Sequence, residues 1–578
     1  MKVLSLGPIF GQTPLIAKSF RSQKGHEIRT LACVGFSPLA DTADYLFQPG
    51  EPVSEILRRI SPEWSPDVLV SWLPELVPPP LGIEHCPLPT VAIVSDWSLR
   101  YPCLAYNLSR FDLVLVDKKG ATFFRPVGVV PEYRFPLYSH WTEVHQDQGL
   151  ERDIDILFVG SLNSAIHGER SRLLERIAAA PQPWHVEIRD GVFGAAYAAL
   201  LNRAKIVVNY TLRGEMNLRC LEATACGALL FIEETNWEIG DWFRPGLEVV
   251  LYNEQNILPL LQRYLKDDTE RSKVAQAGKE RAMRLAGETR LDDVLDIFAA
   301  LEPSERPYLN FREHDKQRAD ISLYSFDMET PMGAWAEYCL QKAAEEDSQN
   351  ALAAAALGFR AYHRSLRADP ETRQQELGAA LHWSKEACRR RPELAVFHYN
   401  LAVVCRACGL NDQAIGFIDA ARKSNDCEDA LFLYGEMTNA GYTGWLKALS
   451  EGSASADMLR GMGAALLAAI LLDKCQWVEA LESASFAESL GHRTRDVYLI
   501  RAAALERLGD TRQATEELEK ALALSAFDYE LRMRLAQAYA KTGRMADLRK
   551  LVDESGRIFS RVPHLTECAE IFSRLLPA

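Results

Sequence analysis

The sequence has no apolar run of the ~20 residues that a helix needs to cross a bilayer. Its 12 cysteines are scattered, and the closest pairs, Cys220 with Cys226 and Cys405 with Cys408, have no second pair at metal-ligand spacing. The C-x-x-C of Cys405 and Cys408 falls in a helical pattern, which favours two helix-packing thiols. Unpatterned thiols suit a reducing compartment, so we expect a cytoplasmic protein.

An excess of positive charge is also lacking, because the formal net charge is -14. This balance argues against nucleic acid or an anionic membrane surface as the partner. Residues Met1–Gly7 carry one lysine and a short apolar stretch, which predicts a β-strand rather than a signal peptide.

A chain of 578 residues should hold several domains, because single cores rarely grow past about 250–300 residues. Apolar runs alternate with helical or loop segments over residues 1–148, and the alternation returns over 149–302. This pattern predicts two consecutive Rossmann-like α/β domains with parallel sheets. The expected strands are Lys2–Leu6, Val68–Trp72, Thr90–Val94 and Leu113–Val116, then Ile154–Val159, Trp184–Arg189, Ile206–Asn209, Ala228–Ile232 and Glu248–Tyr252.

After a linker at 303–330, strand signals vanish and residues 331–578 are expected to be all α. Gly509 and Gly543 mark a period of about 34 residues, the length of a tetratricopeptide repeat. Small residues keep the same phase at Ala402, Gly435, Ala468, Ala502 and Ala536. The pattern therefore resembles a tetratricopeptide α-solenoid, with chance periodicity in a helical bundle as the alternative. Such arrays bind peptides or helices in a concave groove, so we expect a protein or peptide partner.

The segment from Asn209 to Phe231 is the most informative stretch of the chain. It predicts a strand end, a polar loop, a helix over Leu218–Ala225, a glycine stop at Gly227 and a buried strand. Its amide, guanidinium and carboxylate groups fall at the carboxyl end of a strand, where open α/β sheets bind nucleotides.

Two Rossmann-like domains with a polar hinge at 146–152 resemble the GT-B fold of glycosyltransferases. The residues that carry the resemblance are Asp155–Leu162 with Arg170, Ala204–Tyr210, Asn217–Leu230 and Phe243–Tyr252. They are most similar to group 1 glycosyltransferases of the spore-maturation-protein type. The resemblance covers the second domain, and the first domain only by architecture.

The resemblance implies a nucleotide-sugar donor, most simply a UDP-sugar, with no separate cofactor and no metal. Arg219 would clamp the diphosphate, because arginine makes bidentate phosphate contacts, and Glu222 would accept from the ribose hydroxyls. Further donor-binding candidates lie at the ends of two predicted strands or at the start of a predicted helix. They are Gly160, Ser161, Arg170, Asn209, Tyr210 and Asn217. The alternatives are an Arg219–Glu222 surface ion pair, a helix cap for Asn209, an ordinary turn at Gly160 and a solvated helix face for Arg170.

Asp96, after the strand Thr90–Val94, is the candidate catalytic base, or else a helix cap. Many retaining relatives carry two acidic residues at fixed spacing, and Glu222 matches the second of them. The position of the first is occupied here by Gly214, and the nearest acid, Glu215, is offset by one residue. Ser161 stands where the relatives have an arginine. These departures leave the stereochemical class open.

We therefore expect a metal-independent glycosyltransferase that moves a sugar to a hydroxyl, on a protein recruited by the repeats. Deleting the repeats should then remove transfer to the protein and spare donor hydrolysis. The alternative is a non-catalytic assembly protein with a degenerate GT-B module. A sugar-nucleotide epimerase is a third possibility.

Overall fold

The computed structural model describes residues 1–7, 24–34, 43–60, 62–74, 77, 79–95, 97, 104, 106–124, 140, 142–163, 167–285, 287–324, 331–424 and 455–573. The candidate base Asp96 and the repeat position Gly435 lie outside these residues.

The first sheet has six parallel strands in the order β3 (Tyr45–Phe47), β2 (Glu27–Cys33), β1 (Lys2–Leu6), β4 (Val68–Trp72), β5 (Thr90–Ile93) and β6 (Leu113–Leu115). The four predicted strands form its centre and one edge, and helices α1 (Val53–Ile60) and α3 (Lys118–Phe124) belong to the same unit. Strands β2 and β3 escaped prediction because β2 opens with charged residues and β3 has only three residues.

The second sheet has five parallel strands in the order β11 (Val250–Tyr252), β10 (Leu229–Glu233), β9 (Ala204–Val208), β7 (Ile154–Val159) and β8 (Val186–Arg189). Its helices are α4 (Gly168–Ala179), α5 (Gly194–Arg203), α6 (Leu218–Ala225), α7 (Ile239–Trp242), α8 (Ile257–Lys266) and α9 (Asp268–Arg284). Strands β7 and β10 are buried because helices cover both faces, as parallel sheets require. The predicted fold class, parallel α/β sheets followed by helices, is confirmed.

Helix α10 (Gly287–Ala299) returns from the second unit to the first, where Val294, Leu295 and Phe298 join the core under the first sheet. The segment expected as a linker is well packed where the structure describes it. Arg306 is buried and donates to Asp112 and to the carbonyls of Glu84 and Cys86, and a 3-10 turn (Pro307–Asn310) and helix α11 (Glu313–Tyr324) follow.

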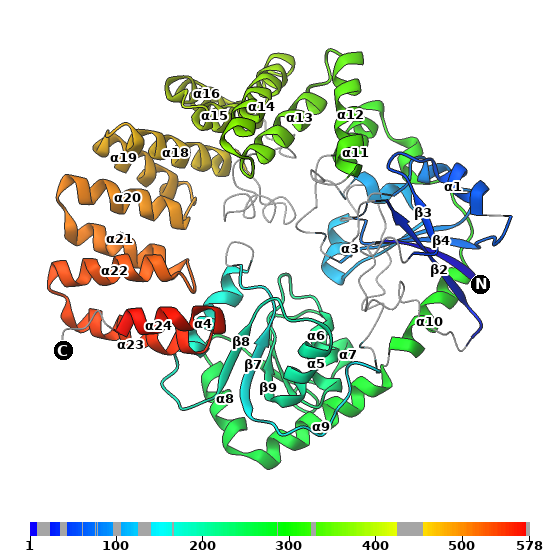
Figure 1. Cartoon of the computed structure of the whole chain (residues 1–578), viewed down its shortest axis with the longest axis horizontal. Coiled ribbons are helices and arrows are strands. Elements are labelled where there is room, and N and C mark those ends of the chain that lie inside the picture. Colours follow the sequence, from blue (N-terminus) through cyan, green and yellow to red (C-terminus); the bar gives the residue numbers. More distant parts are fainter. Residues whose placement is uncertain are drawn as a thin grey trace.

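The remaining described elements are helical and form a curved array (Figure 1). They are α12 (Pro331–Glu346), α13 (Ala351–Ser365), α14 (Pro370–Arg390), α15 (Ala395–Ala407), α16 (Asn411–Lys423), α18 (Ala456–Asp473), α19 (Trp477–Ser489), α20 (Arg495–Leu508), α21 (Thr511–Ala523), α22 (Tyr529–Thr542), α23 (Met545–Ser560) and α24 (Thr566–Ser573). None of the described helices is long and apolar enough to span a membrane.

The repeat phase matches burial in this array. Ala402, Ala468, Ala502 and Ala536 are all buried, so small residues stand where helices cross closely. Gly509 and Gly543 end α20 and α22 in the left-handed conformation, which glycine adopts without strain.

Helices α16 and α18 are in contact in the array. Helix α18 packs on α15 and α16, just as α20 packs on α18 and α19. The unit predicted around Gly435 lies outside the described residues and stays a prediction.

Both ends of the array rest on sheet domains (Figure 1). At its start, Trp335 of α12 packs against the core of the first domain and covers Gly50. At its end, α23 lies against α4 of the second domain. The helical array therefore packs on both sheet domains among the described residues.

Candidate functional site

The predicted donor residues lie at the carboxyl edge of the second sheet. Gly160 follows β7 and Asn209 follows the neighbouring strand β9, so the sheet itself brings the two positions together. Helix α6 starts beside them with Asn217 as its N-cap. This edge is where parallel α/β sheets place their ligands.

Arg219, in the first turn of α6, lies against Gly160. Its Nη1 donates to Asn209 Oδ1 at 2.6 Å, and a Cβ at Gly160 would lie 2.5 Å from its Nη2. Asn209 is fully buried, and its side-chain amide also exchanges hydrogen bonds with that of Asn217 at 3.0 and 3.2 Å. Asn209 therefore orients the guanidinium of Arg219, and its side chain caps no described helix.

Arg170 brings a second guanidinium to the same place. The guanidinium carbons of Arg170 and Arg219 lie 5.2 and 4.9 Å from the ring centre of Phe158, and Arg170 donates to the carbonyl of Ser161. Burial and the neighbouring Arg219 lower the pKa of Arg170 to about 10. Arg170 is buried, so it does not lie on a solvated helix face.

His167, at the N-cap of α4, lies beside the two guanidinium groups of Arg170 and Arg219, which form a cationic cluster. Burial first, and then the neighbouring arginines, lower the pKa of His167 to about 3. No described carboxylate forms an ion pair with Arg170 or Arg219, and their Nε atoms are buried without a hydrogen-bond partner in the described part of the chain. Two neighbouring guanidinium groups that form no ion pair among the described residues are suited to bind an anion.

Glu222 points to a different set of neighbours. Tyr197 Oη donates to Glu222 Oε2 at 3.1 Å, and His145 Nε2 lies 3.8 Å from Oε1. Burial raises the pKa of Tyr197 and lowers that of His145, so both stay neutral hydrogen-bonding groups near pH 7. The expected alternative, an ion pair with Arg219, is not formed among the described residues, because Arg219 donates to Asn209 instead.

Tyr210 is tied to α4, since its hydroxyl donates to Glu169 Oε2 at 2.7 Å. It thus joins the loop after β9 to the helix that carries Arg170. The structure brings Gly160, Ser161, Arg170, Asn209, Asn217 and Arg219 into one group, with Tyr210 and Glu222 at its margins.

The geometry of the loop before α6 explains why Gly214 stands where many relatives have an acidic residue. Gly214 has a φ of 81°, and a Cβ there would lie 3.0 Å from the carbonyl oxygen of Thr235. Glu215 turns back into its own loop and accepts from the backbone nitrogen of Arg213 at 2.7 Å. Glu215 therefore stabilises the loop in this structure.

Arg213 is a site residue that the sequence did not reveal. Its side chain is buried between the two sheet domains, where Nη2 donates to the carbonyl of Ser95 at 2.7 Å and lies 3.4 Å from Asp117 Oδ2. Asp117 also accepts from Trp97 Nε1 at 2.7 Å, and burial raises its pKa. The only available signal was the concentration of polar residues in this loop, which does not show a contact across domains.

Glu238 makes a second bridge between the domains. It accepts from the backbone nitrogens of Lys118, in the first domain, and Met216, in the donor loop, each at 2.8 Å. Burial raises its pKa to about 7.

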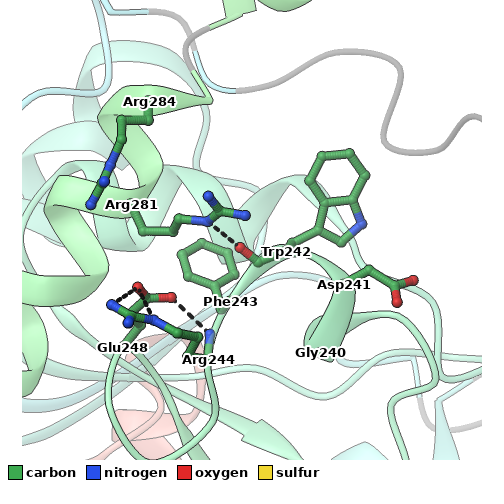
Figure 2. A pocket seen from close by; sticks show the side chains of 8 residues that line it. All are labelled: Gly240, Asp241, Trp242, Phe243, Arg244, Glu248, Arg281 and Arg284. Atoms are coloured by element: carbon green, nitrogen blue, oxygen red, sulfur yellow. Dashed lines mark hydrogen bonds and ion pairs between the residues drawn. The ribbon is translucent and has the colours of Figure 1, made fainter.

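A cavity of about 260 Å³ lies beside α7 and the end of α9 (Figure 2). Arg244 and Glu248 form an ion pair at 2.7 Å on one wall, and Arg281 donates to the carbonyl of Trp242 at 2.6 Å on the other. Its remaining lining residues are Gly240, Asp241, Phe243 and Arg284. No predicted donor residue lines it, so the Phe243–Tyr252 segment does not join the cationic cluster through this cavity. The described residues contain no cluster of three or more metal-ligating side chains.

Comparison with known proteins gives one family match, in the second domain. A family model described as "Glycosyl transferase-like" matches residues 151–295. Similar solved structures include HepE of Anabaena in complex with UDP, with 14% identity, a TM-score of 0.40 and coverage of 52% of this chain and 100% of that one. Sucrose-phosphate synthase of Thermosynechococcus elongatus has 12% identity, a TM-score of 0.37 and coverage of 52% and 100%.

MamA matches with 12% identity, a TM-score of 0.23 and coverage of 36% of this chain and 96% of that one. These structural likenesses are too weak to bear on function. No curated protein sequence matches the chain. The second domain, which carries the cationic cluster, is thus similar to glycosyl transferase-like domains.

Proposed function

We propose that the chain is a glycosyltransferase that takes a sugar from a nucleotide donor bound at the carboxyl edge of the second sheet. The observation that carries this proposal is the cationic cluster of Arg170 and Arg219, with the neutral His167 beside it, which forms no ion pair with a described carboxylate. It lies within the segment that matches the glycosyl transferase-like family model.

The donor diphosphate would lie on Arg219 and Arg170, at the start of α4. Two guanidinium groups and helix amide groups match the charge and geometry of a diphosphate. The same groups would stabilise the negative charge that develops on the diphosphate as it leaves, without a metal ion. Arg219 would thus act in both binding and catalysis.

The nucleoside would lie beside Glu222. Glu222 keeps acceptor capacity for the ribose hydroxyls, because Tyr197 uses only one of its lone-pair positions. Phe193, the residue that precedes α5, has an exposed fraction of 81%, which is unusual for a phenylalanine. It begins the same helix that carries Tyr197, so we assign its ring to stacking on the base.

The acceptor would approach from the first domain, with Asp96 as the base that deprotonates its hydroxyl. A UDP-sugar is the donor to test first. The helical array, as a tetratricopeptide-like surface, would deliver a protein acceptor. We further propose the predicted division at 1–148, 149–302, 303–330 and 331–578, and a cytoplasmic location.

The second candidate function is a non-catalytic assembly protein. Gly214 and Ser161 favour it, because they replace charged residues that the resemblance leads us to expect. Nucleotide binding without any hydrolysis or transfer would support this function over the first.

Thermal unfolding with UDP, GDP, CMP and dTDP tests the proposal. An intact site should be stabilised by one nucleotide, by about 2.7 kcal/mol at a hundredfold excess over Kd. Glu222→Ala should lose most of that stabilisation, while Glu280→Ala, exposed on α9, should keep it. No stabilisation by any of the four nucleotides would refute the proposal.

A further inference from the structure

The end of the helical array and the second sheet domain share one hydrophobic core. Leu173, Leu174 and Ile177 of α4 belong to the same buried cluster as Phe559 of α23 and Val562. Figure 1 shows α23 beside α4, and the two helices are in contact. Helix α4 is therefore packed between its own sheet and the last repeats.

Glu175 of α4 fixes this contact in one register. Its Oε1 accepts from Arg532 Nη2 of α22 at 2.6 Å and from the backbone nitrogen of Phe527 at 2.9 Å. The side chains of Arg532 and Glu175 are 5% and 16% exposed, so the ion pair is screened little by solvent. Arg532 also donates to Ser555 Oγ, which ties the pair to α23.

Arg561 and Arg557 satisfy the carboxyl end of α4. Arg561 Nη1 donates to the carbonyls of Ala178 and Ala180 at 2.7 and 2.8 Å, and Arg557 Nε donates to that of Ala179 at 2.8 Å. The last carbonyls of a helix have no partner within it, and cations near that end also suit its dipole. The array thus supplies the C-terminal cap of α4.

The array also covers an open edge of the sheet. Strand β8 lies at the edge, and the backbone nitrogen of its Ile188 donates to the carbonyl of Arg561 at 3.2 Å. An uncovered edge strand pairs readily with other chains. This hydrogen bond satisfies one backbone group of the edge strand from within the same chain.

At the amino end of α4, by contrast, a cation lies at the positive end of the helix dipole. His167 is its N-cap and Arg170 lies in its first turn, where the helix dipole is already positive. Arg219 adds a further charge nearby, and burial together with Arg219 lowers the pKa of Arg170. Because the two guanidinium groups repel each other, the position of Arg170 depends on what holds α4: the Glu169–Tyr210 hydrogen bond at its start and the contacts with the array further along.

We propose that the last helices of the array, α22 to α24, are a structural part of the donor site. By clamping α4 at Glu175 and at its carboxyl end, they position Arg170 and His167 for the donor diphosphate. This inference rests on the proposed function, because it requires that the cluster binds a diphosphate. Glu175, Arg532 and Arg561 are positioning residues, since none of them lies in the cationic cluster.

The test compares UDP with uridine in the full chain by calorimetry. Glu175→Gln/Arg532→Gln removes the ion pair without leaving one buried charge alone, and the side-chain amide oxygen that replaces the carboxylate can still accept from the backbone nitrogen of Phe527. We expect UDP to bind roughly tenfold more weakly and uridine to bind within about twofold of the wild type, because only the phosphate groups lose a partner. Arg501→Gln/Glu517→Gln is the matched control, since it breaks a pair of similar burial within the array.

Arg532→Lys keeps the charge and should restore most of the UDP affinity. Unchanged UDP affinity in the double variant would overturn the inference, and so would an equal loss for UDP and uridine, which indicates general loss of the fold. Failure of the wild type to bind any of UDP, GDP, CMP and dTDP would refute the proposed function and the inference together.

Discussion

Replacing Gly160 by alanine should damage the donor site with little change to the fold. The added Cβ would lie 2.5 Å from Arg219 Nη2 and 3.2 Å from Phe158 Cζ, so the guanidinium must move away. Its hydrogen bond to Asn209 at 2.6 Å would be lost or lengthened. The backbone φ of Gly160 is 155°, which a side chain also disfavours.

A hydrogen bond to a charged group contributes about 1.5–3 kcal/mol. If the displaced Arg219 loses one such bond to the diphosphate, UDP should bind about 10- to 100-fold more weakly. Calorimetry with UDP and uridine separates this effect from unfolding, because uridine has no phosphate and should bind as in the wild type.

Gly240→Ala is the matched control for Gly160→Ala, since a Cβ there meets nothing within 4 Å. Thermal unfolding of both variants shows whether the fold is retained. UDP affinity equal to that of the wild type in a folded Gly160→Ala variant would refute the assignment of Arg219 to the diphosphate.

Three further predictions address other groups of the site. Glu222→Gln should reduce discrimination between UDP and its 2′,3′-dideoxy analogue, measured as the ratio of their Kd values; an unchanged ratio contradicts a ribose contact. Phe193→Ala should weaken uridine and UDP equally by about 1–3 kcal/mol, the contribution of a base stacked on an aromatic ring, and should leave pyrophosphate binding unchanged. Burial raises the pKa of Glu233 from 4.5 to about 7, so the folded state binds the extra proton and stability should fall as pH rises through this window. Glu233→Gln keeps an oxygen that can accept from Thr211. In this variant the free energy of unfolding should vary less between pH 4.5 and pH 7, and the difference from the wild type should not exceed about 3 kcal/mol.

The sequence predicted the elements whose signals are local. Strands β1, β4 and β7 match their predicted bounds, because each is a run of apolar residues between turn signals. Helix α6 also matches, since Asn217 and Gly227 bracket an apolar face. Strand β3 was missed because three residues carry no measurable periodicity.

The site was predictable where it depends on strand ends, and not where it depends on contacts between domains. Gly160, Asn209 and Arg219 follow from parallel strands that end at one edge. Arg213 and Glu238 could not be found, because their partners Ser95 and Lys118 belong to the other sheet domain.

The array contacts both sheet domains, so a ligand that binds the array could affect the donor site. One end packs on the first domain through Trp335, and the other clamps α4, whose start carries Arg170. If the array end positions Arg170 for the diphosphate, any ligand that bends the array must alter donor affinity. By thermodynamic linkage, the donor must alter the affinity of that ligand by the same factor. A ligand of the array that strengthens donor binding would in turn be held more tightly when the donor site is occupied, and one that weakens donor binding would be released.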